Sequence, residues 1–408
     1  MDCNLLFENA KKAAFTLKNA STEVKNEALK KISDALKANV EKIEKANEID
    51  LSEAEKAGAP KGILDRLSYK KARIEASAED LLNVIALPDP VGEILDDRIT
   101  AAGFRLRKQR VPFGVIGIIY EARPNVTVDV AALCIKTGNA CLLKGGSNAV
   151  NTNEALAEII REAISSVIPR DSVILMPTDR EATAALITAR GKVDLLVPRG
   201  SKRLISYVLE NAKVPVVETG AGVCHLYVDR SADFDKALKI LDNGKTQRPS
   251  VCNALETLLV DREIADKFIP LAIAELSKKG VTFRGEEKGF GFEPLLESGF
   301  YTEYGDLEIS VKIVDGVEEA VSHVNRYGTG HSDCIVAEDD ERSQIFINGV
   351  DSACVYQNVS TRFSDGGCFG FGAELGISTQ KLHARGPMGL TEMTSYRYVL
   401  TGNGEVRK

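Results

Sequence analysis

The 408-residue sequence lacks the features that mark several large classes of protein. Its net charge is −7, so it carries no excess of basic residues that would indicate binding to nucleic acid. No run approaches 18 uncharged apolar residues, and the N-terminus has no basic start followed by an apolar core. The sequence therefore predicts a cytoplasmic protein with no membrane span, no signal peptide and no nucleic-acid partner.

Common metal-binding and nucleotide-binding motifs are missing as well. None of the eight cysteines forms a C-x-x-C pair and the four histidines include no H-x-x-x-H pair, so we expect neither a metal site nor a disulfide scaffold. The sequence has no G-x-x-x-x-G-K loop and no G-x-G-x-x-G fingerprint. The run GGCFGFG at Gly366–Gly372 has its glycines in another order, so a standard Rossmann fingerprint is absent.

After Pro88, short apolar runs alternate with helix-like segments, which is typical of parallel sheets covered by helices. The chain length favours more than one domain, and a seam near Glu218 divides two such α/β units. The expected strands are Val115–Ile119, Ala140–Leu143, Ser172–Leu175, Val193–Val197, Val214–Val217, Cys224–Val228, Glu256–Val260, Val311–Val314, Cys334–Ala337 and Ala353–Tyr356. Ligands are expected at the carboxyl ends of these strands.

The remaining segments differ from this alternation. Before Pro88, one helical face is expected from the spacing of Leu29, Ile32, Leu36, Val40 and Ile43. The polar stretch Arg98–Arg110 predicts a hairpin, and Thr394–Thr401 alternates as an exposed strand would. An unpaired strand edge promotes association, so these two stretches pair either within the chain or with another subunit.

Two turns between a strand and a helix are candidates for holding a dinucleotide. In the first, Lys144, Gly145 and Ser147 precede a helix, whose N-terminus favours an anion, and Lys144 would meet a phosphate or a ribose hydroxyl. In the second, Gly200 and Ser201 would hold a pyrophosphate in the same way. Each turn is equally consistent with an ordinary strand-to-helix connection.

Cys252 is one candidate nucleophile among eight cysteines, and each could instead be a small buried residue. Lys245 and Arg248 precede it closely, and nearby cations favour a thiolate. Amides of a helix or turn at Val251–Ala254 could form an oxyanion hole. Glu218 follows an apolar strand, where it would serve as a general base or as a surface cap.

Longer motifs carry a resemblance to a known family. Glu218 and Cys252, with the segments Tyr120–Ala149, Asn325–Val336 and the glycine-rich Ser360–Leu390, resemble the aldehyde dehydrogenase superfamily. Within it, they resemble the glutamate-5-semialdehyde dehydrogenase family, also called gamma-glutamyl phosphate reductases.

The resemblance implies an α/β fold with two parallel-sheet domains and a small oligomerisation element. Residues 1–218 would form a dinucleotide-binding domain, with 95–110 as part of an oligomerisation hairpin. Residues 219–388 would form the catalytic cysteine domain and 389–408 an oligomerisation strand.

The resemblance also implies an activity. The chain would use NADPH to reduce L-glutamyl 5-phosphate to L-glutamate 5-semialdehyde and phosphate through a Cys252 thioester, the second step of proline biosynthesis from glutamate. A glutamate three residues after the lysine favours NAD in the superfamily, and Ser147 in its place tolerates the 2′-phosphate of NADP. A homo-oligomer and a transient contact with glutamate 5-kinase are the expected partners.

Site roles follow residue by residue from the same resemblance. Cys252 is the nucleophile, Asn125 donates to the oxyanion, and Glu218 tunes the thiol or positions the nicotinamide. The residues expected to bind the cofactor are Lys144, Gly145, Ser147, Gly200, Ser201 and Glu218. The cations expected to bind the substrate are Arg123, Arg362 and Arg385.

One departure and two alternatives accompany this interpretation. Cys368 stands where the family has a carboxylate in its DGGEFGFG motif. The first alternative is another acylating or hydrolytic aldehyde dehydrogenase, which would use CoA or water. The second is a non-catalytic oligomeric binding protein on the same scaffold.

Overall fold

A computed structural model describes residues 2–218 and 220–407. The sequence-based domain boundaries at residues 1, 219 and 408 fall on positions outside this described part. The chain forms two compact units, and each is described by itself. The first comprises Met1–Glu218, Gly370–Gly376 and Met388–Lys408, and the second comprises Thr219–Phe369 and Ile377–Pro387.

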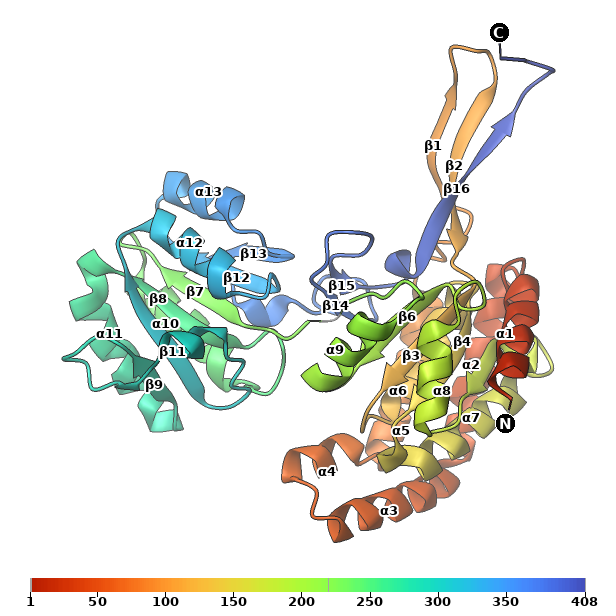
Figure 1. Cartoon of the computed structure of the whole chain (residues 1–408), viewed down its shortest axis with the longest axis horizontal. Coiled ribbons are helices and arrows are strands. Elements are labelled where there is room, and N and C mark those ends of the chain that lie inside the picture. The colour runs from red at the N-terminus through yellow and green to blue at the C-terminus, as the bar shows by residue number, and fades with distance from the viewer. Residues whose placement is uncertain (1, 219, 408) are drawn as a thin grey trace. The chain divides into compact units, whose positions relative to one another are not determined.

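The first unit is built around a parallel sheet with the strand order β5-β4-β3-β6 (Figure 1). Its strands are β3 (Val115–Tyr120), β4 (Ala140–Gly145), β5 (Val173–Leu175) and β6 (Leu195–Arg199). Its helices are α1 (Cys3–Leu17), α2 (Thr22–Ala38), α3 (Val40–Lys56), α4 (Lys61–Leu67), α5 (Lys71–Ala86), α6 (Asn125–Lys136), α7 (Val150–Ile164), α8 (Arg180–Thr188) and α9 (Lys202–Asn211). One core joins α1, α8 and α9 to the sheet, while α6 and α7 pack with α2, α3 and α5.

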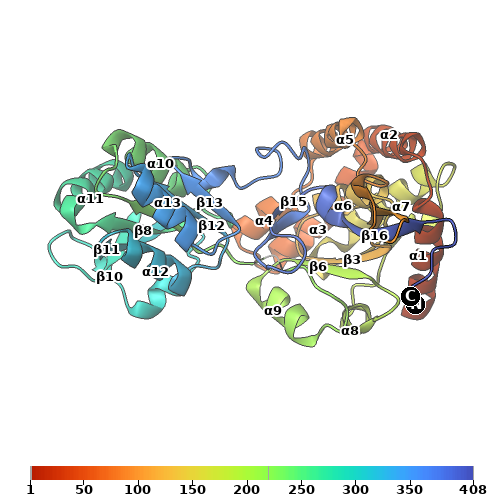
Figure 2. The same ribbon diagram turned by 90° about the horizontal axis from the view of Figure 1, so that it is seen from above.

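An antiparallel sheet with the order β1-β2-β16 projects from the first unit (Figure 1), and Figure 2 views it from above. Its strands are β1 (Ile94–Ile99), β2 (Arg105–Pro112) and β16 (Thr394–Thr401). The predicted hairpin is confirmed, although it begins earlier than expected, and the C-terminal strand pairs along β2. Of the two pairings left open by the sequence, the structure therefore shows the one within the chain.

The second unit contains a larger parallel sheet with the order β10-β9-β11-β8-β7-β12-β13. Its strands are β7 (Cys224–Val228), β8 (Leu255–Asp261), β9 (Thr282–Gly285), β10 (Glu293–Pro294), β11 (Glu308–Val314), β12 (Ser332–Val336) and β13 (Cys354–Gln357). Helices α10 (Phe234–Thr246) and α11 (Arg262–Leu276) pack on one face, and α12 (Val317–Tyr327) and α13 (Asp340–Gly349) pack on the other. Two short strands, β14 (Gly376–Ser378) and β15 (Gly386–Met388), pair with each other.

The α/β class predicted from the sequence is confirmed, and two local expectations are corrected. Val214–Val217 is not a strand: Val216 forms one bridge to Leu196, and Pro215 cannot donate to a ladder. The single helical face is divided between α2 and α3, because the chain leaves helical geometry at Asn39. The short strands β9 and β10 were not predicted.

No helix within residues 2–218 or 220–407 is both long enough and apolar enough to span a membrane.

Candidate functional site

Cys252 lies in a turn between α10 and β8, and its side chain is half-buried. This turn precedes β8, so the cysteine stands at the amino end of its strand. Cys252 itself therefore does not lie at a carboxyl strand end, where the topology predicts that ligands collect. Of the helix or turn expected at Val251–Ala254, the structure shows a turn, with the Ala254 amide donating to the Val251 carbonyl over 3.0 Å.

Close contacts within the second unit fix the backbone on both sides of Cys252. A Cβ built on Gly222 would lie 1.5 Å from the Cys252 carbonyl oxygen, so only glycine fits there. The Cys224 thiol donates to that same oxygen over 3.2 Å. On the other side, Thr361 Oγ1 donates to the Asn253 carbonyl over 2.8 Å, and Asn253 Nδ2 donates to the Ser364 carbonyl over 2.9 Å.

Arg362 supplies positive charge near the thiol. Its Nε donates to Gln247 Oε1 over 3.1 Å, and its side chain is half-buried. Burial lowers the pKa of Arg362, the neighbouring Arg248 lowers it further, and interaction with Cys252 opposes both effects. Two guanidinium groups near a nucleophile favour an anionic substrate.

Lys245 does not support the thiolate of Cys252, as its position in the sequence suggested. Its side chain is fully buried, and its Nζ lies 2.7 Å from Glu256 Oε2. The Lys245 ammonium group therefore faces a carboxylate inside the second unit rather than a thiolate in the Cys252 turn.

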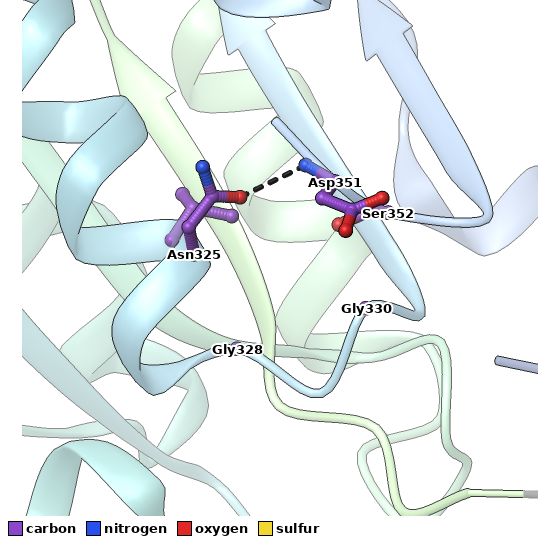
Figure 3. Close-up of a pocket in the computed structure, with 6 residues that line it drawn as sticks. Asn325, Gly328, Gly330, Asp351 and Ser352 are labelled. Carbon is purple, nitrogen blue, oxygen red and sulfur yellow. Dashed lines mark hydrogen bonds between the residues drawn. The ribbon is translucent and has the colours of Figure 1, made fainter. Parts of the chain in front are cut away.

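Arg385, the other substrate-binding candidate in this unit, contacts Asp351. Its Nη2 lies 2.8 Å from Asp351 Oδ1, and Lys381 pairs with the same carboxylate. Asp351 and Asn325 line a small cavity of about 290 Å³ together with Gly328 and Gly330. The Asp351 amide donates to Asn325 Oδ1 over 2.8 Å across this cavity (Figure 3).

In the first unit, the Lys144 turn borders a cavity of about 510 Å³ at the carboxyl ends of β4 and β5. Its lining residues are Gly145, Ser147, Val150, Asn153, Glu154, Leu175, Met176, Pro177, Thr178 and Asp179. Lys144 Nζ donates to the Thr178 carbonyl over 2.8 Å, and burial lowers the pKa of this lysine. The volume suits a nucleotide portion, and the amino end of α7 follows the turn.

The second predicted turn already holds a carboxylate. The Ser201 amide donates to Glu121 Oε2 over 2.9 Å, and a Cβ on Gly200 would lie 2.6 Å from that oxygen. The Glu121 carboxylate therefore occupies the place at the amino end of α9 that was expected for a phosphate. This contact could not be predicted from sequence patterns, because Glu121 is distant from Gly200 along the chain.

Asn125 is exposed at the first position of α6. Its Nδ2 donates to Asp129 Oδ2 over 2.9 Å, and burial raises the pKa of Asp129 to about 7. Ala122, three residues earlier, has a φ of 45°, which is unusual for a residue other than glycine and is often associated with functional sites.

The other first-unit candidates, Arg123 and Glu218, are half-buried. The structure therefore places Gly145 and Ser147 at one cavity of the first unit, and Lys144 directly precedes them and donates to Thr178 of the same cavity. In the second unit, Arg362 lies near Cys252, whereas Arg385 forms an ion pair with Asp351.

Asn253 and Thr361 were not predicted as parts of the site. Asn253 directly follows Cys252, so its position was a usable signal, whereas the Thr361 contact depends on tertiary folding. In the part of the chain that the structure describes, no group of three or more His, Cys, Asp or Glu residues could hold a metal ion.

Comparisons with known proteins agree with one another. Residues 1–288 match the model of the aldehyde dehydrogenase family. Gamma-glutamyl phosphate reductase from Thermobifida fusca is 49% identical over 412 residues, covering 100% of this chain and 99% of the relative. The protein of the same name from Caldanaerobacter subterraneus is also 49% identical, with complete coverage of both chains.

Solved structures give the same result. The crystal structure of gamma-glutamyl phosphate reductase from Thermotoga maritima has a TM-score of 0.98 at 45% identity, covering 100% of both chains. An acetylating aldehyde dehydrogenase from Geobacillus thermoglucosidasius has a TM-score of 0.70 at 18% identity, covering 100% of this chain and 97% of the other. The latter likeness concerns the fold alone.

Proposed function

We propose a function from the premise that this chain belongs to the aldehyde dehydrogenase family, and within it to the gamma-glutamyl phosphate reductases. The chain reduces L-glutamyl 5-phosphate to L-glutamate 5-semialdehyde and phosphate with NADPH, a step of proline biosynthesis. The observation that carries the proposal is end-to-end identity of 49% to a reductase of that name. The Cys252 turn supplies a thiol suited to this chemistry.

The cavity beside Lys144 is the proposed NADPH site. Gly145 and Ser147 line it, and the amino end of α7 and the Lys144 ammonium group favour phosphate oxygens. Bound there, NADPH supplies the hydride for reduction. Gly200 and Ser201 would contact its pyrophosphate only after the Glu121 carboxylate leaves the Ser201 amide.

Cys252 forms and breaks the covalent bonds to substrate. Its thiolate attacks the acyl carbon of the mixed anhydride, the acyl–oxygen bond breaks, and phosphate leaves with the electron pair. After reduction of the resulting thioester, the carbon–sulfur bond breaks and the thiolate is regenerated with the aldehyde. The Arg362 guanidinium favours both the thiolate and the anionic phosphate.

Other residues receive supporting roles. Asn125 would donate to the oxyanion, with Asp129 orienting its amide. Arg123 and Arg385 would attract the substrate carboxylate, although Arg385 would have to share its guanidinium with Asp351. Glu218 would tune the thiol or position the nicotinamide and would not activate water, since hydrolysis of the thioester would waste the substrate.

The domain and partner assignments are part of the same proposal. The first unit binds the dinucleotide, the second carries the nucleophile, and the β1-β2-β16 sheet contributes to a homo-oligomer. A transient contact with glutamate 5-kinase would shorten the lifetime of the reactive acyl phosphate in water. A cytoplasmic location follows from the proposed pathway.

The reverse reaction tests the function. NADP is mixed with glutamate 5-semialdehyde, and absorbance of NADPH is followed with phosphate, with CoA, or with neither. We expect reduction that depends on phosphate. Equal rates without phosphate would indicate a hydrolytic enzyme, and rates restored only by CoA would indicate an acylating one.

A further inference from the structure

A buried ion pair joins the two ends of the segment that carries Cys252. Lys245 lies near the end of α10 and Glu256 near the start of β8, and the side chains of both have 0% exposure. Their Nζ and Oε2 atoms are 2.7 Å apart. The ten residues between them, 246–255, include the proposed nucleophile.

Each partner also binds backbone. Lys245 Nζ donates to the Leu255 carbonyl over 2.8 Å, which fixes the chain where the segment enters β8. Glu256 Oε1 accepts from the Gly305 amide over 3.1 Å. The pair therefore ties together three segments of the second unit: the end of α10, the start of β8 and the turn at Gly305.

The turn at Gly305 leads back to the nucleophile. Two residues earlier, Glu303 Oε1 accepts from the Gly222 amide over 3.1 Å. Gly222 packs directly on the Cys252 carbonyl oxygen, which also accepts from the Cys224 thiol. A continuous series of contacts thus runs from the ion pair to the backbone of Cys252.

Stability alone does not account for this pair. Burial raises the pKa of Glu256 to about 7 and lowers the pKa of Lys245, so the environment opposes both charged forms. An apolar pair of similar volume is often as stable as a buried ion pair, or more stable. An apolar pair would, however, lose the hydrogen bonds to the Leu255 carbonyl and the Gly305 amide.

We propose that Lys245 and Glu256 are positioning residues, which hold the segment carrying Cys252 in the geometry needed for attack on the acyl carbon. This inference rests on the proposed function, in which Cys252 is the nucleophile. Neither side chain is accessible to substrate, so both act through the backbone.

The double variant Lys245→Met/Glu256→Leu separates positioning from stability. It removes both charges together, so no uncompensated buried charge remains, and any fall in the melting temperature reflects only the lost bonds to the Leu255 carbonyl and the Gly305 amide. We expect the rate of Cys252 alkylation by iodoacetamide and kcat each to fall at least tenfold, since a misplacement of about 1 Å can cost roughly 100-fold. KM for NADPH should not change, because the proposed cofactor residues are elsewhere.

A matched control uses a similarly buried ion pair of the first unit. Lys25 and Asp89 form it, with side-chain exposures of 2% and 7%. The variant Lys25→Met/Asp89→Leu should leave the alkylation rate of Cys252 unchanged, whatever its effect on the melting temperature.

Three outcomes are distinguishable. A folded Lys245→Met/Glu256→Leu variant with normal kcat and normal Cys252 alkylation would overturn the positioning role and leave the proposed function intact. If iodoacetamide reacts faster with another thiol than with Cys252 in the unchanged protein, that result would instead contradict the assignment of Cys252 as the nucleophile. If the double variant fails to fold, Glu256→Gln is the variant that tests the proposal. It keeps the shape of the side chain but only one of its two hydrogen-bond acceptors. A normal rate of Cys252 alkylation and a normal kcat in Glu256→Gln would overturn the proposal.

Discussion

At the residue scale, the proposed chemistry depends on a thiol in the turn before β8 and on an ammonium group near the end of β4. Cys252 and Lys144 could be singled out because each stands beside a turn in a recognisable motif. Lys245 looked like a partner for the thiolate because it is close in sequence, yet it is buried against Glu256. Glu121 was missed because its contact with Ser201 depends on the pairing of β3 with β6.

Ser147→Glu is expected to lower the affinity for NADPH at least tenfold and to leave NADH binding unchanged or tighter. The new carboxylate would face the 2′-phosphate in the cavity beside Lys144, and like charges repel there. Fluorescence titration with each cofactor measures both constants.

Ser147→Gln is the matched control for that change, since it adds the same bulk without the charge. If the two variants lose NADPH affinity equally, size rather than charge governs the preference, and Ser147 does not lie near the 2′-phosphate.

At the element scale, alternating apolar runs gave most strands within one to three residues, because buried parallel strands are continuous in their hydrophobicity. The failures have local causes. Pro215 limits Val214–Val217 to one bridge, and Asn39 divides the expected helix. The pairing of β16 with β2 joins distant parts of the chain, which periodicity cannot reveal.

The segment before β7 gives the clearest prediction at this scale. Gly222→Ala should lower kcat at least tenfold and destabilise the protein by roughly 1–3 kcal/mol, because its Cβ would lie 1.5 Å from the Cys252 carbonyl oxygen. Steady-state kinetics and denaturant unfolding measure the two effects.

Gly62→Ala in α4 is the control, since an added Cβ there meets nothing within 4 Å. Its stability should change by no more than about 1 kcal/mol, and toward greater stability. Normal kcat in Gly222→Ala would show that the contact with Cys252 does not position the thiol.

At the scale of the whole molecule, two parallel sheets covered by helices could be predicted from the sequence. Buried polar networks of the second unit could not, because each depends on strands that are distant in sequence. The environment of His323 could not be predicted either: it packs between Phe300 and Tyr327, with ring centroids 4.9 and 4.4 Å away, and the contact with Phe300 depends on tertiary folding.

His323 is expected to make stability depend on pH. Burial lowers its pKa from an ordinary 6.5 to about 3, so the folded protein keeps it neutral while the unfolded chain binds a proton. The contribution of His323 to the free energy of unfolding is complete above pH 6.5. It is lost as the pH falls toward 3, at up to about 1.4 kcal/mol per pH unit.

His323→Phe removes that titration and retains an aromatic ring. Between pH 6.5 and 5, its free energy of unfolding should fall less steeply than that of the unchanged protein, in urea titrations at matched pH. Groups such as Glu256 titrate in both proteins, so their effects cancel in the comparison. Identical slopes would mean that His323 is protonated in the folded state.

The central claim is that Cys252 forms a thioester with the substrate acyl group. The most direct measurement is peptide mass spectrometry after acid quenching of the protein mixed with glutamate 5-semialdehyde and NADP, without phosphate. The account predicts a glutamyl adduct on the Cys252 peptide, which disappears when phosphate is added and never forms in Cys252→Ser. An adduct on another cysteine, or turnover with no adduct in Cys252→Ser, would contradict it.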